Sequence, residues 1–188
     1  MFNSDFMRVS FFIFMLSILP VSVSNADAEE PWLLVETENR VLKVMNGERV
    51  LEVFNKIAIG SRGADWEKHR NDKKTPLGEY RIGWVNENSR YHRFFGLTYP
   101  NKENAKRAYL AGVLGESTLR AILRAEVEED VPPQNTALGG QIGIHGVGKA
   151  NSMIHDEFDW TSGCIAMTDE QIDRLTPWIK KGTPVVIR

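Results

Sequence analysis

The sequence of 188 residues contains a single cysteine, Cys164. One cysteine cannot form an intramolecular disulfide bond, and it cannot build a cysteine-rich zinc or iron–sulfur site. An excess of charge of either sign is also missing, because 23 Lys and Arg residues stand against 25 Asp and Glu residues, for a formal net charge of −2. The broad basic field that nucleic-acid binding usually requires is therefore absent, and we expect no nucleic-acid partner.

The sequence also lacks an apolar run long enough for a comfortable membrane span, which takes about 20 residues. Its most apolar segment covers residues 9–23, follows Arg8, and is followed by the small residues of Ser24-Asn25-Ala26. This pattern predicts a signal peptide over residues 1–26, export to the periplasm, and no stable membrane span after cleavage. Because the positive region ahead of the apolar run is weak, an uncleaved N-terminal anchor is the alternative.

The remaining residues, 27–188, have the length of one ordinary domain that buries its own core. Asn46-Gly47 lies between apolar runs, which is a strong hairpin signal because both turn residues need positive φ. A β-meander is therefore expected, with strands at about 32–37, 40–46 and 48–59. Charges of both signs in residues 62–74 predict a solvated loop. A turn at 75–78 and a strand whose Tyr80, Ile82 and Trp84 share one face should follow.

The second half of the chain mixes helical and strand patterns. Helices are expected at 101–111 and at 117–130, the latter with an apolar stripe of Leu119, Ile122, Leu123 and Val127 that we assign to the core. Further elements are expected at 141–145 (strand), 168–175 (helix with a Thr168–Gln171 capping box) and 184–188 (strand). The fold class is therefore β-dominated, a mainly antiparallel β sandwich or barrel with peripheral helices, because regular βαβ alternation is missing.

Cys164 follows Thr161-Ser162-Gly163, a tight-turn sequence and not the apolar run in which a structural cysteine normally stands. N–H groups at such a turn can point at a developing oxyanion. A thiol nucleophile also needs a base, because at a free pKa of about 8.5 only a minority is thiolate near neutral pH. His145 is the best candidate, since it ends an alternating strand and shares a strand face with Gly143; a structural histidine is the alternative.

Three other histidines are less suited to be the base. His69 lies in the charged loop and should be exposed, and His155 lies in what reads as a polar loop. His92 follows Tyr91 in a strand or loop that leads to the core. A metal site made of His145, His155 and Cys164 is conceivable, but its spacings match no common zinc pattern.

Two motifs resemble the signature of the L,D-transpeptidase catalytic domain family (YkuD-type). In chain order they are Ile144-His145-Gly146 and Thr161-Ser162-Gly163-Cys164-Ile165-Ala166-Met167. Around the cysteine, Trp160-Thr161 before it and Ile165-Ala166 after it resemble a Gram-negative branch of this family. Thr75-Pro76-Leu77-Gly78-Glu79-Tyr80 and Leu97-Thr98-Tyr99-Pro100-Asn101 are similar to two further family segments. The resemblance covers about residues 32–188, and four segments in the right order are specific.

The resemblance implies the L,D-transpeptidase fold and an activity on peptidoglycan tetrapeptide stems. Cys164 would attack the carbonyl of the third stem residue, expel D-Ala and form a thioester, with His145 as general base and acid. The backbone carbonyl of Gly146 would orient His145. An acceptor amine would complete a crosslink, whereas water would make the protein an L,D-carboxypeptidase or amidase. No metal or cofactor is needed, and we expect a monomer whose partners are stem peptides.

Further roles follow from the same resemblance. The residues assigned to the oxyanion are Thr161, Ser162 and Gly163, and those assigned to substrate binding are Tyr91, His92, Arg93 and Tyr99. The family usually has Arg where Ala166 stands, so the anchor of a substrate carboxylate must come from elsewhere. Arg81, Arg90, Arg93 and Lys149 are open candidates.

Two competing interpretations remain. Papain-like and NlpC-like peptidases also cut wall peptides, but in those chains the cysteine precedes the histidine, whereas His145 precedes Cys164 here. A wall-binding module that kept the fold and lost the chemistry should lack nucleophile or base, and both are present.

Overall fold

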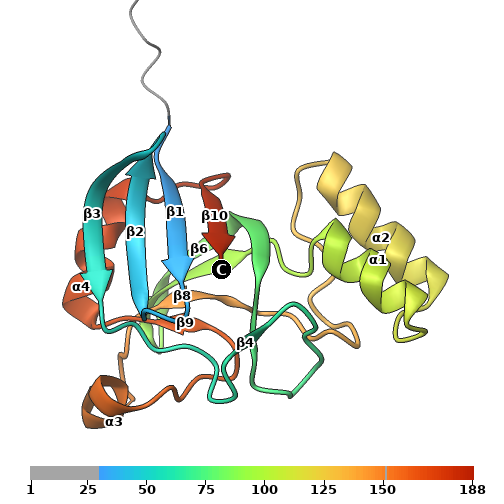
Figure 1. Ribbon diagram of the computed structural model, residues 1–188. Coiled ribbons are helices and arrows are strands. Elements are labelled where there is room, and N and C mark those ends of the chain that lie inside the picture. The colour runs from blue at the N-terminus through green and yellow to red at the C-terminus, as the bar shows by residue number, and fades with distance from the viewer. Residues whose placement is uncertain (1–29, 151) are drawn as a thin grey trace, which may run out of the picture.

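The computed structural model describes residues 30–150 and 152–188, so the expected signal peptide over residues 1–26 lies outside the described residues. The main strands are β1 (Trp32–Glu36), β2 (Val41–Asn46), β3 (Arg49–Asn55), β6 (Gly78–Ser89), β7 (His92–Leu97), β8 (Gly143–His145), β9 (Ile165–Ala166) and β10 (Pro184–Ile187). They form one eight-stranded sheet in the order β3-β2-β1-β10-β6-β7-β8-β9 (Figure 1). Only the β1–β10 and β8–β9 pairs of this sheet are parallel. The expected β-dominated fold is confirmed.

The helices lie at the periphery of this sheet (Figure 1). They are α1 (Lys102–Leu110), α2 (Glu116–Val127), α3 (Ser152–Glu157), α4 (Asp169–Leu175) and the 3-10 helix η1 (Thr176–Trp178). In Figure 1, α1 and α2 form a hairpin to one side of the body, and α3 lies at its lower end. Within the described residues, none of the helices combines the length and apolar character that crossing a membrane requires.

The expected meander is present, since β2 pairs antiparallel with both β1 and β3. Gly47 in the connecting turn has a φ of 54°, which glycine adopts without strain. The third strand ends at Asn55, four residues before its expected end at 59. Lys56 has a φ of 59°, and a left-handed residue of this kind ends a strand.

The segment after β3 returns to the opposite edge of the sheet. Ala58 forms an isolated antiparallel bridge with Ala166 of β9, and both backbone hydrogen bonds between these residues are present. Because β3 and β9 are the two outer strands, this bridge brings the edges together and curls the sheet toward a barrel.

One expected strand face is broken by a change of register. Tyr80 and Ile82 of β6 are buried as expected, but the pairing with β7 shifts between Ile82 and Trp84. The Trp84 ring instead covers Gly96, where an added Cβ would overlap the indole. Trp84 is half-buried and lines a surface cleft, so the prediction that it shares one face with Tyr80 and Ile82 was wrong.

The charged segment 62–74 is more ordered than a solvated loop. Ala64–Asp65 (β4) pairs in parallel with Thr75–Pro76 (β5), where a turn was expected. The Lys68 side chain is only 3 % exposed and its Nζ lies 2.8 Å from Asp72 Oδ1. A buried ammonium needs such a partner, and the mixed-sign charge of the segment supplies it locally.

Both helices expected in residues 101–130 are present. The first begins after Asn101, whose side chain accepts from the Asn104 N–H at 2.8 Å. In α2, Ile122 is buried as expected, whereas Val127 is 83 % exposed. The core assignment of Val127 was therefore wrong. The α1–α2 hairpin protrudes to one side of the body (Figure 1).

Candidate active site

An open cleft with a volume of about 770 Å³ contains Cys164 and His145 in its wall. We call it the Cys164 cleft. Its walls come from the tip of the β6–β7 hairpin, the segment that enters β8, and the loop that precedes β9. The lining residues are Trp84, Asn86, Asn88, Ser89, Arg90, Tyr91, Phe94, Gly140, Gln141, Ile142, His145, Trp160, Thr161, Ser162 and Cys164.

The loop that carries Cys164 is fixed to the segment after β3. Asp159 forms an ion pair with Arg40, and its Oδ1 accepts from the Ile59 N–H at 2.9 Å. Thr161 N–H donates to Ile59 O at 3.1 Å, and Ser61 N–H donates to Thr161 O at 3.0 Å. The nucleophile candidate therefore stands on a rigid support, which accurate catalytic geometry requires.

Residues 161–164, which we call the cysteine turn, are closed by their own hydrogen bonds. Thr161 Oγ1 donates to Cys164 O at 2.7 Å and accepts from the Gly163 N–H at 3.1 Å. Gly163 has a φ of 130°, and an added Cβ would lie 2.5 Å from Lys74 O, so the position requires glycine. Of the residues expected at the oxyanion, Thr161 and Gly163 have N–H groups that already donate, to Ile59 O and Thr161 Oγ1. No described residue accepts from the N–H groups of Ser162 and Cys164.

The Cys164 thiol is partly exposed in the cleft and donates to Gln141 O, with Sγ 3.5 Å from that oxygen. Burial raises the pKa of this thiol to about 11, while the Gly143 backbone N–H and the Lys68 ammonium act in the opposite direction. The thiol is therefore protonated at neutral pH in the ligand-free protein.

His145 is 2 % exposed, and its Nδ1 lies 2.7 Å from Gly146 O. A carbonyl only accepts, so Nδ1 carries the proton and Nε2 is the free acceptor. Burial lowers the pKa of His145 to about 4, partly offset by its bond to Gly146. The imidazole is thus neutral at pH 7 and available as a base. His145 and Cys164 line the same cleft, and between these two described side chains there is no hydrogen bond.

Three aromatic rings enclose the imidazole. Tyr91 stacks on it with centroids 4.4 Å apart, Phe94 lies parallel at 6.0 Å, and Trp160 approaches edge-on at 5.9 Å. Their apolar surface removes water from His145, which is the physical cause of its low pKa. Of the three, Phe94 was not among the sequence candidates, whereas Tyr91 was assigned to substrate binding and Trp160 stands at the start of the motif around Cys164.

The segment after His145 is held from the side of α4. Asp169 Oδ1 accepts from the Gly148 N–H at 2.8 Å, and the Met167 N–H donates to His145 O at 2.9 Å. The Thr168–Gln171 capping box that was expected is present in both directions. The start of α4 therefore connects the cysteine turn to the histidine segment.

Trp160 is itself held by His155, since its Nε1 donates to His155 Nδ1 at 3.3 Å. His155 lies on α3 and is 4 % exposed, so the expectation that it lies in a polar loop was wrong. Its Nε2 has no hydrogen-bond partner among the described residues. His155 is therefore linked to the cleft by its hydrogen bond with Trp160.

The four residues assigned to substrate binding lie in different places. Tyr91 lines the Cys164 cleft. His92 and Arg93 both turn to Asp173 on α4, with contacts of 2.8 and 3.3 Å, outside that lining. Tyr99 is fully buried because its ring is part of the core, and its hydroxyl donates to Leu138 O at 2.9 Å.

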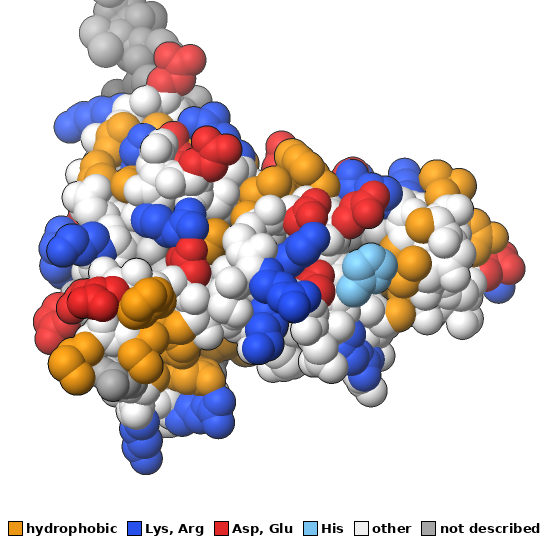
Figure 2. Space-filling view, turned by 60° about the horizontal axis from the view of Figure 1, so that its bottom comes forward, with side chains coloured by type: hydrophobic (Ala, Val, Ile, Leu, Met, Phe, Trp, Pro, Cys, Tyr) orange, Lys and Arg blue, Asp and Glu red, His pale blue; other side chains and the backbone are white. Residues whose placement is uncertain are grey.

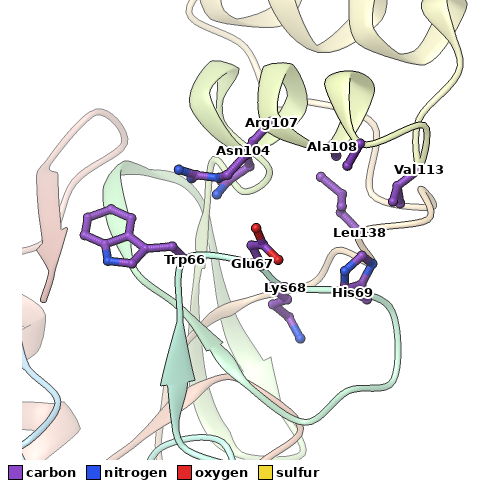
Figure 3. A pocket seen from close by; sticks show the side chains of 10 residues that line it. Trp66, Glu67, Lys68, His69, Asn104, Arg107, Ala108, Val113 and Leu138 are labelled. Carbon is purple, nitrogen blue, oxygen red and sulfur yellow. The ribbon is translucent and has the colours of Figure 1, made fainter.

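The remaining sites are distinct from this cleft. Among the described residues, no three His, Cys, Asp or Glu side chains gather as a metal site would require. A smaller pocket lies between residues 66–69 and α1, lined by Trp66, Glu67 and Arg107 among others (Figure 3). In Figure 3 the Lys68 side chain points away from α1. It reaches the back of the cysteine turn, where its Nζ would be 3.1 Å from a Cβ on Gly163.

Comparisons with known proteins agree with this geometry. The family model of the L,D-transpeptidase catalytic domain matches residues 30–187. No curated protein matches the chain. Among solved structures, the helical cell shape determining protein Pgp2 from Campylobacter jejuni is 22% identical, with a TM-score of 0.59, over 86% of this chain and 48% of that one. Bd1075 of Bdellovibrio bacteriovorus is also 22% identical, with a TM-score of 0.52 and the same coverage of 86% and 48%.

At these identities the two structures support the fold alone, and the chain spans about half of their length. The family model, in contrast, covers nearly the whole described part of the chain. The chain therefore belongs to the L,D-transpeptidase catalytic domain family.

Proposed function

We propose that the protein is a cysteine-dependent acyltransferase that acts on the tetrapeptide stems of peptidoglycan in the periplasm. The observation that carries this proposal is the shared cleft of Cys164 and His145, in which the His145 Nδ1–H is held by Gly146 O and leaves Nε2 as the acceptor. Family membership supplies the class of substrate. The geometry supports the roles proposed here for Cys164 as nucleophile, His145 as base and Gly146 O as the orienting carbonyl.

The first half-reaction makes a thioester. The Sγ–H proton passes to His145 Nε2 as Sγ attacks the carbonyl carbon of the third stem residue. The resulting oxyanion is held by the free N–H groups of Ser162 and Cys164. When the C–N bond breaks, its electron pair stays on the nitrogen of the terminal D-Ala, which takes the proton from His145.

The second half-reaction returns the enzyme to its starting state. An acceptor amine attacks the thioester carbonyl and gives its proton to His145, and the C–S bond then breaks to regenerate the thiol. With the side-chain amine of a neighbouring stem as acceptor the product is a crosslink. With water the product is a free acid, and the protein acts as a carboxypeptidase or amidase.

Burial lowers the pKa of His145 to about 4 and raises the pKa of Cys164 to about 11, so both groups are neutral at pH 7 in the ligand-free protein. The proton therefore leaves the thiol as Sγ attacks, after Sγ has turned from Gln141 O toward the imidazole. Substrate that displaces water from the cleft and contacts Gln141 favours this turn.

The test incubates the purified protein with tetrapeptide-containing muropeptides and follows D-Ala release and the mass of the protein. We expect an acyl adduct that is absent in Cys164→Ala, and a strong loss of rate in His145→Gln. His69→Gln is the matched control, because His69 is exposed and lies outside the Cys164 cleft. D-Ala release that persists in Cys164→Ala contradicts the proposal.

The same assay assigns the second half-reaction. It is run with and without a second stem peptide that carries a free side-chain amine. A crosslinked dimer that appears only with this acceptor supports transfer, whereas a tripeptide product in both reactions shows that water resolves the thioester. The products thus separate transferase from hydrolase without any change to the protein.

A further inference from the structure

We propose that Arg90 binds a carboxylate of the stem peptide and so sets the specificity of the Cys164 cleft for substrates with a free acid. This inference rests on the proposed function and goes beyond it, because it assigns a recognition residue and the substrate group it reads.

The first observation is the charge of the cleft. None of its lining residues is acidic, and Arg90 is the one Lys or Arg among them. His145 is neutral at pH 7. The fixed charge of the wall is therefore a single positive one, whereas a stem peptide carries several carboxylates. A lone guanidinium in an otherwise neutral cleft is the complement that such an anion requires.

The second observation is that Arg90 has no carboxylate partner among the described residues. Other arginines near the site do: Arg40 pairs with Asp159, and Arg93 pairs with Glu87 and Asp173. The Arg90 guanidinium lies 4.6 Å over the Tyr91 ring and donates to Tyr91 Oη. A guanidinium has five N–H donors, so a carboxylate can still bind in a two-point geometry.

The third observation is how firmly Arg90 is placed. It occupies the two-residue tip between β6 and β7, where the Tyr91 N–H donates to Ser89 Oγ at 3.1 Å. The Lys149 N–H donates to Arg90 O at 3.2 Å, and Gly148 packs so closely that a Cβ would lie 2.5 Å from that oxygen. The segment that follows His145 therefore fixes the backbone of Arg90.

The Arg90 guanidinium lies over the Tyr91 ring, which stacks on His145, so the charge of Arg90 also acts on the pKa of His145. Arg90 is one of the groups that lower the pKa of His145. A bound carboxylate neutralises the guanidinium and removes that contribution, so the imidazole becomes a stronger base when the correct substrate is present. Elsewhere on the surface, α3 and the residue that follows it expose the hydrophobic side chains of Met153, Ile154 and Phe158. Figure 2 shows hydrophobic side chains gathered at the lower left of the molecule, with Lys and Arg side chains beside them.

The alternative anchors are less suitable. Arg81 is exposed and lines a different cleft, formed with residues of α2 and β10. Arg93 is held between two carboxylates. Lys149 is not part of the Cys164 cleft lining. Of the four open candidates, Arg90 alone combines a place in that lining with a free guanidinium.

The experiment compares three tetrapeptides: one with all its carboxylates free, one with a C-terminal carboxamide, and one with the carboxylate of the third residue amidated. Each is assayed for thioester formation and kcat/KM with the full protein, with Arg90→Gln and with Arg90→Lys. The control is Arg120→Gln, an exposed residue of α2 that pairs with Glu116. It should behave as the wild type.

We expect the wild type to prefer the free acid over one of the amides by about 10- to 100-fold, the range of a charge-assisted hydrogen bond. Arg90→Gln should lose that preference, with kcat/KM on the free acid reduced to the level of the amide, and Arg90→Lys should keep part of it. The amidated peptide with the largest loss of kcat/KM in the wild type identifies the carboxylate that Arg90 binds. An unchanged preference in Arg90→Gln overturns the inference, as does a wild type that shows none. If the wild type forms no thioester with any peptide, the proposed function itself fails.

Discussion

The imidazole of His145 stacks on the phenol ring of Tyr91, with centroids 4.4 Å apart and planes at 29°. Tyr91 stands at the tip of the β6–β7 hairpin, so one short turn controls both the solvation of the base and the charge beside it. Stacking of this kind contributes about 0.5–1.5 kcal/mol beyond burial.

Loss of the Tyr91 ring should admit water to His145. We expect Tyr91→Leu to raise the pKa of His145 from about 4 toward the ordinary value, because water then reaches the imidazole. Tyr91→Phe keeps the ring and should leave the pKa near that of the wild type. The measurement is an NMR titration of the histidine signals, with His145→Gln to assign them. Equal His145 pKa values in Tyr91→Leu and the wild type would contradict this reading.

The stability of the protein should fall on mild acidification. The folded pKa of His145 is lowered, so below its unfolded value of about 6.5 the unfolded chain binds more protons than the native protein. The lost stability grows as the pH falls from about 6.5 to about 4 and can reach about 3 kcal/mol. No contribution is expected above pH 7.

Urea unfolding at pH 7.5 and pH 4.5 measures this effect. His145→Gln should show a smaller loss of stability between the two pH values than the wild type. His155, whose pKa burial also lowers, contributes in the same direction and is unchanged in that variant. An identical pH dependence of the two proteins would show that His145 is not desolvated.

Lys68 should assist ionisation of Cys164 from behind the cysteine turn. Its ammonium is one of two groups that lower the pKa of the thiol. We expect Lys68→Met to raise that pKa, read as slower alkylation by iodoacetamide across a pH series. Lys74→Met is the control in the same loop, since Lys74 pairs with Asp65 and has no such effect on the thiol. A larger change in Lys74→Met than in Lys68→Met would refute the assignment.

Gly163→Ala should destabilise the cysteine turn by about 2 kcal/mol or more, because it combines an unfavourable φ with a collision at Lys74 O. Gly182→Ala separates the two causes. Gly182 has a φ of 91°, but a Cβ there meets nothing within 4 Å. Thermal unfolding should show a clearly larger loss for Gly163→Ala, and equal losses would rule out the collision.

Signals within a few residues of each other were read correctly from the sequence. The turn at Asn46-Gly47 gave the meander, and the spacing of Thr168 and Gln171 gave the capping box that begins α4. The cysteine turn and the end of β8 at His145 also follow from local patterns of small and alternating residues. Such features depend on the backbone preferences of neighbouring residues, and these preferences follow from the residue types alone.

Features that depend on distant pairing could not be predicted. Whether Lys68 is buried depends on packing behind Gly163, about 95 residues further along the chain, and Trp84 leaves its strand face because of a shift in pairing with β7. His155 seemed polar in its sequence context and is buried because α3 folds under Trp160. In each case a tertiary contact outweighs the local pattern.

The ion pair of Arg40 with Asp159 joins residues 119 apart in sequence, and the Ile59–Asp159 bond spans 100. Contacts of such long range close large loops and form late in folding. The support of the cysteine turn is therefore complete only when the first strands meet the last quarter of the chain. Until then Cys164 is an ordinary solvated thiol without a base, so its pKa reports whether folding has been completed.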